Sequence, residues 1–299
     1  MSATATVDTL AGFACEVGAA RSGTNFLGEL LSAHPMLAYW RRPKYIWRHG
    51  NAWQPDDCLT AERATPRIRR FIRRRFAEYL QVSGRPRLLV CTQANVLALD
   101  FVNAVFPEGK ILHIIRDGRE VAASQKREWE LHSTIGGGER IPLFQLLAMR
   151  VKEVPPTDLP AYFGEFAGTM WNWLSGNRYR YSMGPKIKDW RRLTGEMDRL
   201  AFCALTWREC VSAARRVGQT MPADRYHEVR FEELMSRPEE TVARLLEFLD
   251  LPPAQSIDEF VAKKLKRETS GKWLSRLDQE ELDTVMPYVG ELCQELGYV

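Results

Sequence analysis

The sequence predicts an α/β fold, a single domain in which a parallel sheet is flanked by helices. A short strand over 13–17 runs through a glycine-bounded turn into a helix over 26–32, where apolar residues recur at helical spacing. The same strand-to-helix order recurs along the chain, which favours parallel strands joined by right-handed crossovers. The chain has 299 residues, 45% of them hydrophobic, which suits one large domain.

The turn after the first strand has the spacing of a P-loop, because four residues separate Gly18 from Gly23. The backbone N–H groups of such a turn lie at the positive end of the next helix dipole, where anions bind. A nucleotide triphosphatase has Lys and Ser/Thr after the second glycine, whereas Thr24 and Asn25 stand here and the cation, Arg21, lies inside the turn. A guanidinium clamps an oxyanion without a metal, so the turn predicts a P-loop-like site for a phosphate-like group and no metal. A plain strand–turn–helix corner is the alternative.

Three segments around the first helix differ from the sheet pattern. Residues 1–10 are predicted to be disordered. Residues 38–47 are aromatic and cationic, and are interpreted either as a pocket lining or as an irregular connection anchored by Trp40 and Trp47. Residues 61–81 are predicted to form a helix, either with a solvated arginine face or with a face for an anionic acceptor or membrane headgroup. Its arginines are Arg67, Arg69, Arg70, Arg73, Arg74 and Arg75.

Two more strands, over 87–92 and 111–115, precede a second strand-to-helix junction. The first is apolar throughout, as a parallel strand covered on both faces should be, and a helix over 95–105 follows it. The second leads into Arg116 and, farther along, Ser124. Ligands on such sheets bind outside the carboxyl ends of the strands, so both junctions are predicted to face one crevice and share one ligand.

The second half of the chain is less regular. Residues 128–195 are predicted to form a helical and aromatic excursion that covers the site, although most of its aromatics suit a satellite core. A helix over 195–217 with a buried Trp207, a fourth strand over 226–230, and helices over 238–249 and 278–296 complete the predicted fold.

Composition narrows the class of protein. A net charge of +4 does not call for nucleic acid, although it allows a local basic pocket. Six cysteines without a CxxC pair favour free thiols in a reducing compartment. We find no signal peptide and no apolar stretch near the roughly 20 residues that span a bilayer. The sequence thus predicts a soluble, cytoplasmic protein.

The motifs, taken in order, resemble those of the sulfotransferase family. They are Arg-Ser-Gly-Thr at 21–24, Ile-Ile-Arg-Asp-Gly-Arg-Glu-Val-Ala-Ala-Ser at 114–124, Tyr-His-Glu-Val-Arg-Phe-Glu-Glu-Leu at 226–234, Gly-Lys-Trp at 271–273 and Leu-Gly-Tyr at 296–298. These enzymes use 3′-phosphoadenosine 5′-phosphosulfate (PAPS) and release 3′-phosphoadenosine 5′-phosphate (PAP). The resemblance implies a sulfotransferase-like domain over 1–299, with the excursion on the acceptor side, and transfer to a small-molecule or carbohydrate hydroxyl or amine.

The resemblance also implies roles for individual residues. Arg21 is expected to act in catalysis and to hold the 5′-phosphosulfate together with Ser22, Gly23, Thr24 and Asn25. Arg116 and Ser124 are expected to hold the 3′-phosphate. Phe231 is expected near the adenine, and Lys272 is expected to close over the phosphates.

The usual bases of the family are replaced. Many members carry a Glu where Arg41 and Arg42 stand, and the cytosolic branch has Lys-Thr-His where Cys91, Thr92 and Gln93 stand. Three explanations stay open: another base, an acceptor that is already ionisable or an amine, or a catalytically degenerate protein that binds PAP or PAPS without efficient transfer. Candidate bases are His49, Asp56, Asp57, Glu128 and His132. Cys91 is either a low-pKa nucleophile or, more commonly for such a residue, a buried inert thiol.

Overall fold

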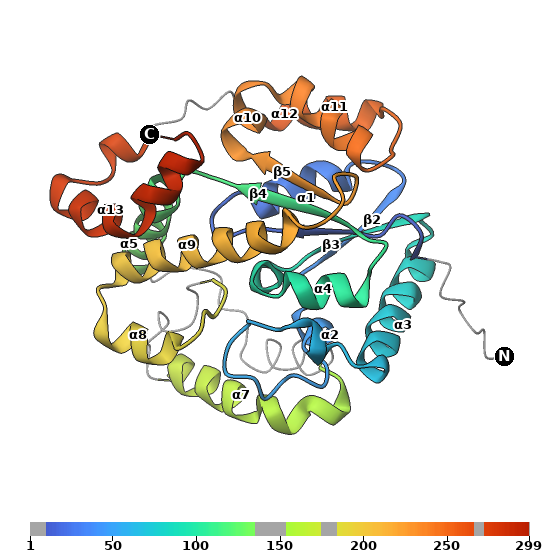
Figure 1. Ribbon diagram of the computed structural model, residues 1–299, viewed down its shortest axis with the longest axis horizontal. Helices are drawn as coiled ribbons and strands as arrows, with labels where there is room; N and C mark the ends of the chain where they lie inside the picture. The colour runs from blue at the N-terminus through green and yellow to red at the C-terminus, as the bar shows by residue number, and fades with distance from the viewer. Residues whose placement is uncertain (1–9, 135–153, 175–183, 266–271, 299) are drawn as a thin grey trace.

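The structure is a computed structural model that describes residues 10–134, 154–174, 184–265 and 272–298 (Figure 1). The disorder predicted for the N-terminus falls on residues 1–9, which lie outside the described residues. Leu10, the last residue of that prediction, is instead buried in the core. Its apolar side chain belongs to the same hydrophobic cluster as Phe13.

Five parallel strands form one sheet in the order β2-β3-β1-β4-β5. Four of them occupy the predicted positions: β1 (Ala14–Val17), β3 (Arg87–Cys91), β4 (Lys110–Ile115) and β5 (Tyr226–Arg230). β1 pairs with β3 on one side and with β4 on the other, so the strand order reverses its direction at β1. Such a switch point opens a crevice outside the carboxyl ends of the strands.

The fifth strand, β2 (Leu37–Arg41), corrects the interpretation of residues 38–47 as an irregular connection, whereas Lys44 and Trp47 do line a pocket. It pairs in register with β3, from Leu37 opposite Arg87 to Arg41 opposite Cys91, and the short helix α2 (Lys44–Trp47) follows. Both faces of β2 carry aromatic side chains that pack on helices, so the alternation of polar and apolar residues that marks a half-buried strand is missing.

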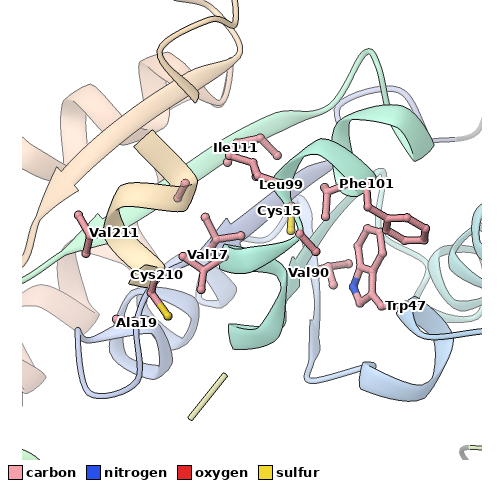
Figure 2. Packing of buried hydrophobic residues seen from close by; sticks show 14 of the residues in the cluster. Cys15, Val17, Ala19, Trp47, Val90, Leu99, Phe101, Ile111, Cys210 and Val211 are labelled. Atoms are coloured by element: carbon pink, nitrogen blue, oxygen red, sulfur yellow. The ribbon is translucent and has the colours of Figure 1, made fainter. Parts of the chain in front are cut away.

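Helices cover both faces of the sheet (Figure 1). One face packs against α1 (Thr24–Ser32), α10 (Phe231–Ser236), α11 (Pro238–Phe248) and α12 (Gln255–Lys264). The other packs against α3 (Pro66–Ser83), α4 (Leu99–Val105), α5 (Gly118–Thr134), α9 (Arg199–Gly218) and α13 (Gln279–Glu295). Figure 2 shows this second core, where Cys15, Val17, Val90 and Ile111 from the sheet meet Leu99, Phe101, Cys210 and Val211.

The predicted helices are present with adjusted ends. The helix predicted over 95–105 divides into the 3₁₀ helix η3 (Gln93–Leu97) and α4, and α9 begins after Asp198, which caps its first backbone N–H groups. Trp207 is buried as predicted. α12 was not predicted. The remaining short 3₁₀ helices are η2 (Ala61–Arg63) and η5 (Lys272–Ser275).

The described part of the excursion contains η4 (Pro156–Asp158), α7 (Leu159–Leu174) and α8 (Trp190–Glu196). It is fastened to the segment after β2: the Tyr162 ring packs edge-on against Tyr45, with centroids 4.8 Å apart, and the Trp190 Nε1–H donates to the Pro55 carbonyl at 2.8 Å. A separate hydrophobic cluster that includes Val154 forms there. Tyr162 belongs to this cluster, but Phe163 and Trp171 are exposed, so the satellite core predicted for most aromatics of the excursion is confirmed for Tyr162 and wrong for these two.

All six cysteines are unpaired, as predicted, and Cys58 alone among them is exposed. Within the described residues, no helix combines the length and the apolar composition that a membrane span requires.

Candidate functional site

The turn after β1 lies at the switch point of the sheet, and two of its glycines are required by close packing. A Cβ on Gly18 would stand 2.8 Å from the Ile114 carbonyl oxygen of β4. Gly23 adopts φ 101°, and a Cβ there would overlap the Phe231 ring. The turn is thus pressed against β4 and α10, which brings three of the sequence motifs together.

Arg21 lies at the centre of the turn in the left-handed region, with φ 69°. Its Nε–H donates to the Ser124 hydroxyl of α5 at 3.2 Å, and its Nη1 lies 2.5 Å from a Glu128 carboxylate oxygen on the same helix. A non-glycine residue in this region costs on the order of 1 kcal/mol or more, and such strain concentrates at functional sites. The conformation directs the guanidinium to α5.

Arg116 connects β4 to the turn. Its Nη1–H donates to the Arg21 carbonyl at 3.3 Å, and its Nη2 lies 3.4 Å from Glu120 Oε2. The guanidinium also lies 4.4 Å from the centroid of the Phe231 ring, within the range of a cation–π contact. The Trp207 indole N–H donates to the Arg116 carbonyl at 3.0 Å, which fixes the backbone where β4 ends.

The C-terminal motif supports the same junction. The Tyr298 hydroxyl lies 3.1 Å from a Glu232 carboxylate oxygen, and the other oxygen of Glu232 accepts the Asp117 backbone N–H at 3.0 Å. The last residues of the chain therefore hold the residue that follows Arg116 in place.

The polar side chains of the turn differ in their hydrogen-bond partners. The Ser22 hydroxyl is buried and has no hydrogen-bond partner among the described residues. Thr24 Oγ1 accepts from the Gln93 amide at 3.3 Å, and Asn25 Oδ1 accepts from Arg42 Nη2 at 3.4 Å. The end of the turn is thus joined to the residues that follow β3 and β2.

Lys272 is the predicted site residue whose side chain lies outside the described residues. Its backbone starts η5, and the next residue, Trp273, donates its backbone N–H to Glu120 Oε1 at 3.2 Å. Because Glu120 also contacts Arg116, η5 begins close to the second junction.

The four candidate bases whose side chains the structure describes have different surroundings. His49 and Asp158 form a buried pair at 2.7 Å, with the His49 ring stacked on Phe71. Asp57 is buried against Arg48 at 2.7 Å, and Asp56 accepts the Cys58 backbone N–H at 3.0 Å. These three carboxylates and the imidazole make structural contacts.

Glu128 is the one candidate whose described contacts reach the turn, through its ion pair with Arg21. The side chain of His132 lies outside the described residues. Sequence spacing gave a partial signal for Glu128, since it stands one helical turn after Ser124.

Cys91 is buried between β2, β1 and α1. Burial raises the pKa of its thiol well above the ordinary value, and the neighbouring Glu16 raises it further. A protonated, enclosed thiol is a poor nucleophile, so the structure favours the inert interpretation.

Sequence reasoning missed three contacts that shape the site. Glu120 and Trp207 hold Arg116, and Arg42 contacts Asn25. The spacing of Arg116 and Glu120, four residues apart on the way into a helix, was the available signal. No spacing relates Trp207 or Arg42 to their partners. Among the described residues, no group of three or more His, Cys, Asp or Glu side chains is placed to hold a metal ion.

Comparison with known proteins finds one matching family model and a similar protein sequence. The family model described as "Sulfotransferase family" matches residues 16–136 and 177–255. Nodulation protein NoeE of Sinorhizobium fredii (strain NBRC 101917 / NGR234) is 23% identical over an alignment 317 positions long, which covers 94% of this chain. The chain spans 65% of the length of that relative.

Two solved structures share the fold. The sulfotransferase domain from the curacin biosynthetic pathway is similar with a TM-score of 0.54 at 13% identity, over 97% of this chain and 99% of that one. The sulfotransferase domain of the Synechococcus PCC 7002 olefin synthase gives a TM-score of 0.51 at 16% identity, over 92% and 94% of the two chains. Since the family model matches well over half of the sequence, the chain belongs to the sulfotransferase family.

Proposed function

We propose that the protein transfers a sulfuryl group from PAPS to a hydroxyl group of a small-molecule or carbohydrate acceptor. The observation that carries this proposal is the convergence of Arg21, Arg116 and Ser124 on one turn at the switch point of the sheet. Two guanidinium groups, a hydroxyl and the N–H groups of a helix N-terminus suit a ligand with two separate phosphate-type groups.

The positions of the residues suit the nucleotide in one orientation. Residues 21–25 would hold the 5′-phosphosulfate, for which the buried Ser22 hydroxyl offers an unused hydrogen-bonding group. Arg116 and Ser124 would hold the 3′-phosphate. Phe231, beside both Gly23 and Arg116, would pack near the adenine, and Lys272 would close over the phosphates.

The residues of the site would promote transfer mainly by electrostatics. Negative charge grows on the leaving phosphate as the acceptor oxygen bonds to sulfur, and Arg21 and the N–H groups of the turn would stabilise that charge. Glu128 is the proposed base for the acceptor proton, because it stands against Arg21. Residues 128–195 would border the acceptor.

We also propose that the protein is located in the cytoplasm.

Calorimetric titration with PAP, with and without Mg²⁺, tests the nucleotide site. We expect metal-independent binding that Arg116→Ala weakens by roughly 2–5 kcal/mol, as for a lost partner of a buried charge. Arg74→Ala removes an exposed arginine of α3 and serves as the control, with unchanged affinity. Failure of the parent protein to bind PAP would refute the proposal.

A transfer assay separates the enzyme from its alternative, a degenerate sulfotransferase that holds PAP without efficient transfer. The replaced positions Arg41, Arg42, Cys91 and Gln93 favour that alternative. Mass spectrometry of acceptor panels incubated with PAPS would detect products. PAP binding without any product would support the degenerate protein.

A further inference from the structure

Two adjacent arginines, Arg41 and Arg42, stand at the carboxyl end of β2 with exposed side chains. Arg42 adopts the left-handed region with φ 60°. Its backbone is held on both sides, because its N–H donates to the Cys91 carbonyl and its carbonyl accepts from Lys44, each at 2.7 Å. This fixed conformation carries the guanidinium to Asn25 at the end of the turn, 3.4 Å from Oδ1.

The sheet order places this pair on the side of the turn away from Arg116. β4, which ends at Arg116, is the neighbour of β1 on one side, whereas β3 and then β2 lie on the other. In the proposed function the nucleotide extends from the turn toward β4. An in-line transfer brings the acceptor in opposite the leaving phosphate, which leaves the β3 and β2 side for the acceptor.

Arg41 and Arg42 also differ from the other arginines of the site in their ion pairing. Arg21 contacts Glu128 and Arg116 contacts Glu120, but no acidic side chain of the described residues forms an ion pair with Arg41 or Arg42. Guanidinium groups stay protonated and cannot act as bases. They attract carboxylates and phosphates through paired N–H donors, and they repel ammonium groups.

We propose that Arg41 and Arg42 recognise the acceptor, and that the acceptor is a hydroxyl compound that carries an anionic group, a carboxylate or a phosphate, in the same molecule as its reacting oxygen. This inference rests on the proposed function and names the substrate class. The acceptor oxygen bonds to sulfur while the bond from sulfur to the donor phosphate oxygen breaks, PAP leaves with the electron pair, and the hydroxyl proton passes to Glu128. Amine acceptors are disfavoured, because a protonated amine would face two cations.

Matched acceptors that differ in one charged group test the proposal. One set is para-hydroxybenzoate, para-cresol and tyramine, and the other is the methyl glycosides of glucuronate, glucose and glucosamine. Transfer from PAPS is measured by mass spectrometry, and binding of the same compounds to the PAP-saturated protein is measured by saturation-transfer NMR.

The protein variants are Arg41→Gln, Arg42→Asn and Arg42→Lys. Asn tolerates the left-handed backbone, so Arg42→Asn removes the charge without adding strain, while Arg42→Lys keeps the charge.

We expect transfer to the anionic member of at least one set to be about tenfold faster than transfer to its neutral partner, the factor that ~1.4 kcal/mol gives. The amine should be the poorest acceptor. Arg42→Asn should bring the ratio close to one, and Arg42→Lys should restore part of it, with PAP affinity within about threefold of the parent. If no compound is a substrate, the NMR ranking decides by the same criterion.

Three results with the acceptor compounds would overturn the inference: a neutral or amine compound ranking first, a ranking that survives Arg41→Gln and Arg42→Asn, or no binding of either anionic compound. Loss of PAP affinity in Arg42→Asn would also overturn it, by assigning Arg42 to the nucleotide. Absence of PAP binding in the parent refutes the proposed function itself, so the two failures are distinguishable.

Discussion

Arg21 donates to Ser124 and pairs with Glu128, two residues more than a hundred positions away in the sequence. Both partners lie on one face of α5, one helical turn apart, so a single guanidinium can contact both side chains. A phosphosulfate at the turn would compete with the Glu128 carboxylate for this guanidinium. The pair is half-exposed, so little stability depends on it, and its importance lies in the charge that it presents to a ligand.

Replacing Glu128 by Gln should separate binding from turnover. We expect transfer to fall by about 10²-fold or more, as for a lost general base. PAP affinity should hold or rise, because Arg21 loses a competing anion. Turnover is measured with the acceptor panel and affinity by calorimetry. Glu78→Gln, which removes a similarly exposed partner of Arg75, is the control, and parental turnover in Glu128→Gln would exclude Glu128 as the base.

At the scale of the element, the position of α1 on the sheet depends on Gly28. A Cβ at this residue would overlap the hydroxyl and ring of Tyr39 on β2, so the small residue lets the helix approach the strand. The turn that binds the proposed ligand is the start of the same helix. Packing between α1 and β2 therefore helps to set the direction of the N–H groups at residues 23–25.

Gly28→Ala should destabilise the protein by about 1–3 kcal/mol, as overpacked core substitutions do. Gly164→Ala in α7 provides the matched control, because no atom of the described residues lies within 4 Å of the added Cβ there. In that helix the alanine should stabilise by about 0.5–1 kcal/mol. Denaturant unfolding measures both, and equal effects of the two variants would contradict the role of Gly28.

For the whole molecule, two fully buried side chains of the sheet, His113 and Glu16, make the free energy of unfolding depend on pH in opposite directions. Burial lowers the pKa of His113 to about 3, and its Nδ1 lies 2.7 Å from the Tyr226 hydroxyl. The unfolded chain then binds a proton that the folded protein does not, from pH 6.5 down to about 3. Stability conferred by neutral His113 is therefore lost as the pH falls through this window.

Glu16 acts in the other direction. Burial raises the pKa of its carboxyl well above the ordinary value of 4.5, and neither of its oxygens has a hydrogen-bond partner among the described residues. The folded protein keeps a proton that the unfolded chain releases, so stability falls as the pH rises above 4.5.

Unfolding in denaturant across this pH range should show both slopes. Glu16→Gln should gain stability relative to the parent, and the gain should grow with pH above 4.5. His113→Asn should flatten the acid side of the profile, whatever its cost at neutral pH. Slopes that neither variant alters would show that other groups control the pH dependence.

Local sequence determined much of this protein. The apolar runs of β3 and β4, and the glycine-bounded turn after β1, are encoded in consecutive residues, because short-range periodicity and backbone sterics set them. The same is true of both strand-to-helix junctions, and hence of the proximity of Arg21, Arg116 and Ser124, since parallel strands end on one edge of a sheet.

Tertiary structure decided the rest. β2 is a strand because β3 supplies its hydrogen bonds. Helices cover both of its faces, and its sequence therefore lacks the alternation of polar and apolar residues that predicts a strand. Which of five candidate bases reaches the turn depended on α5 packing beside Arg21, and the contact of Arg42 with Asn25 depended on the strand order. These pairings are long-range contacts, fixed when packing and burial select one arrangement, and no spacing along the chain encodes them.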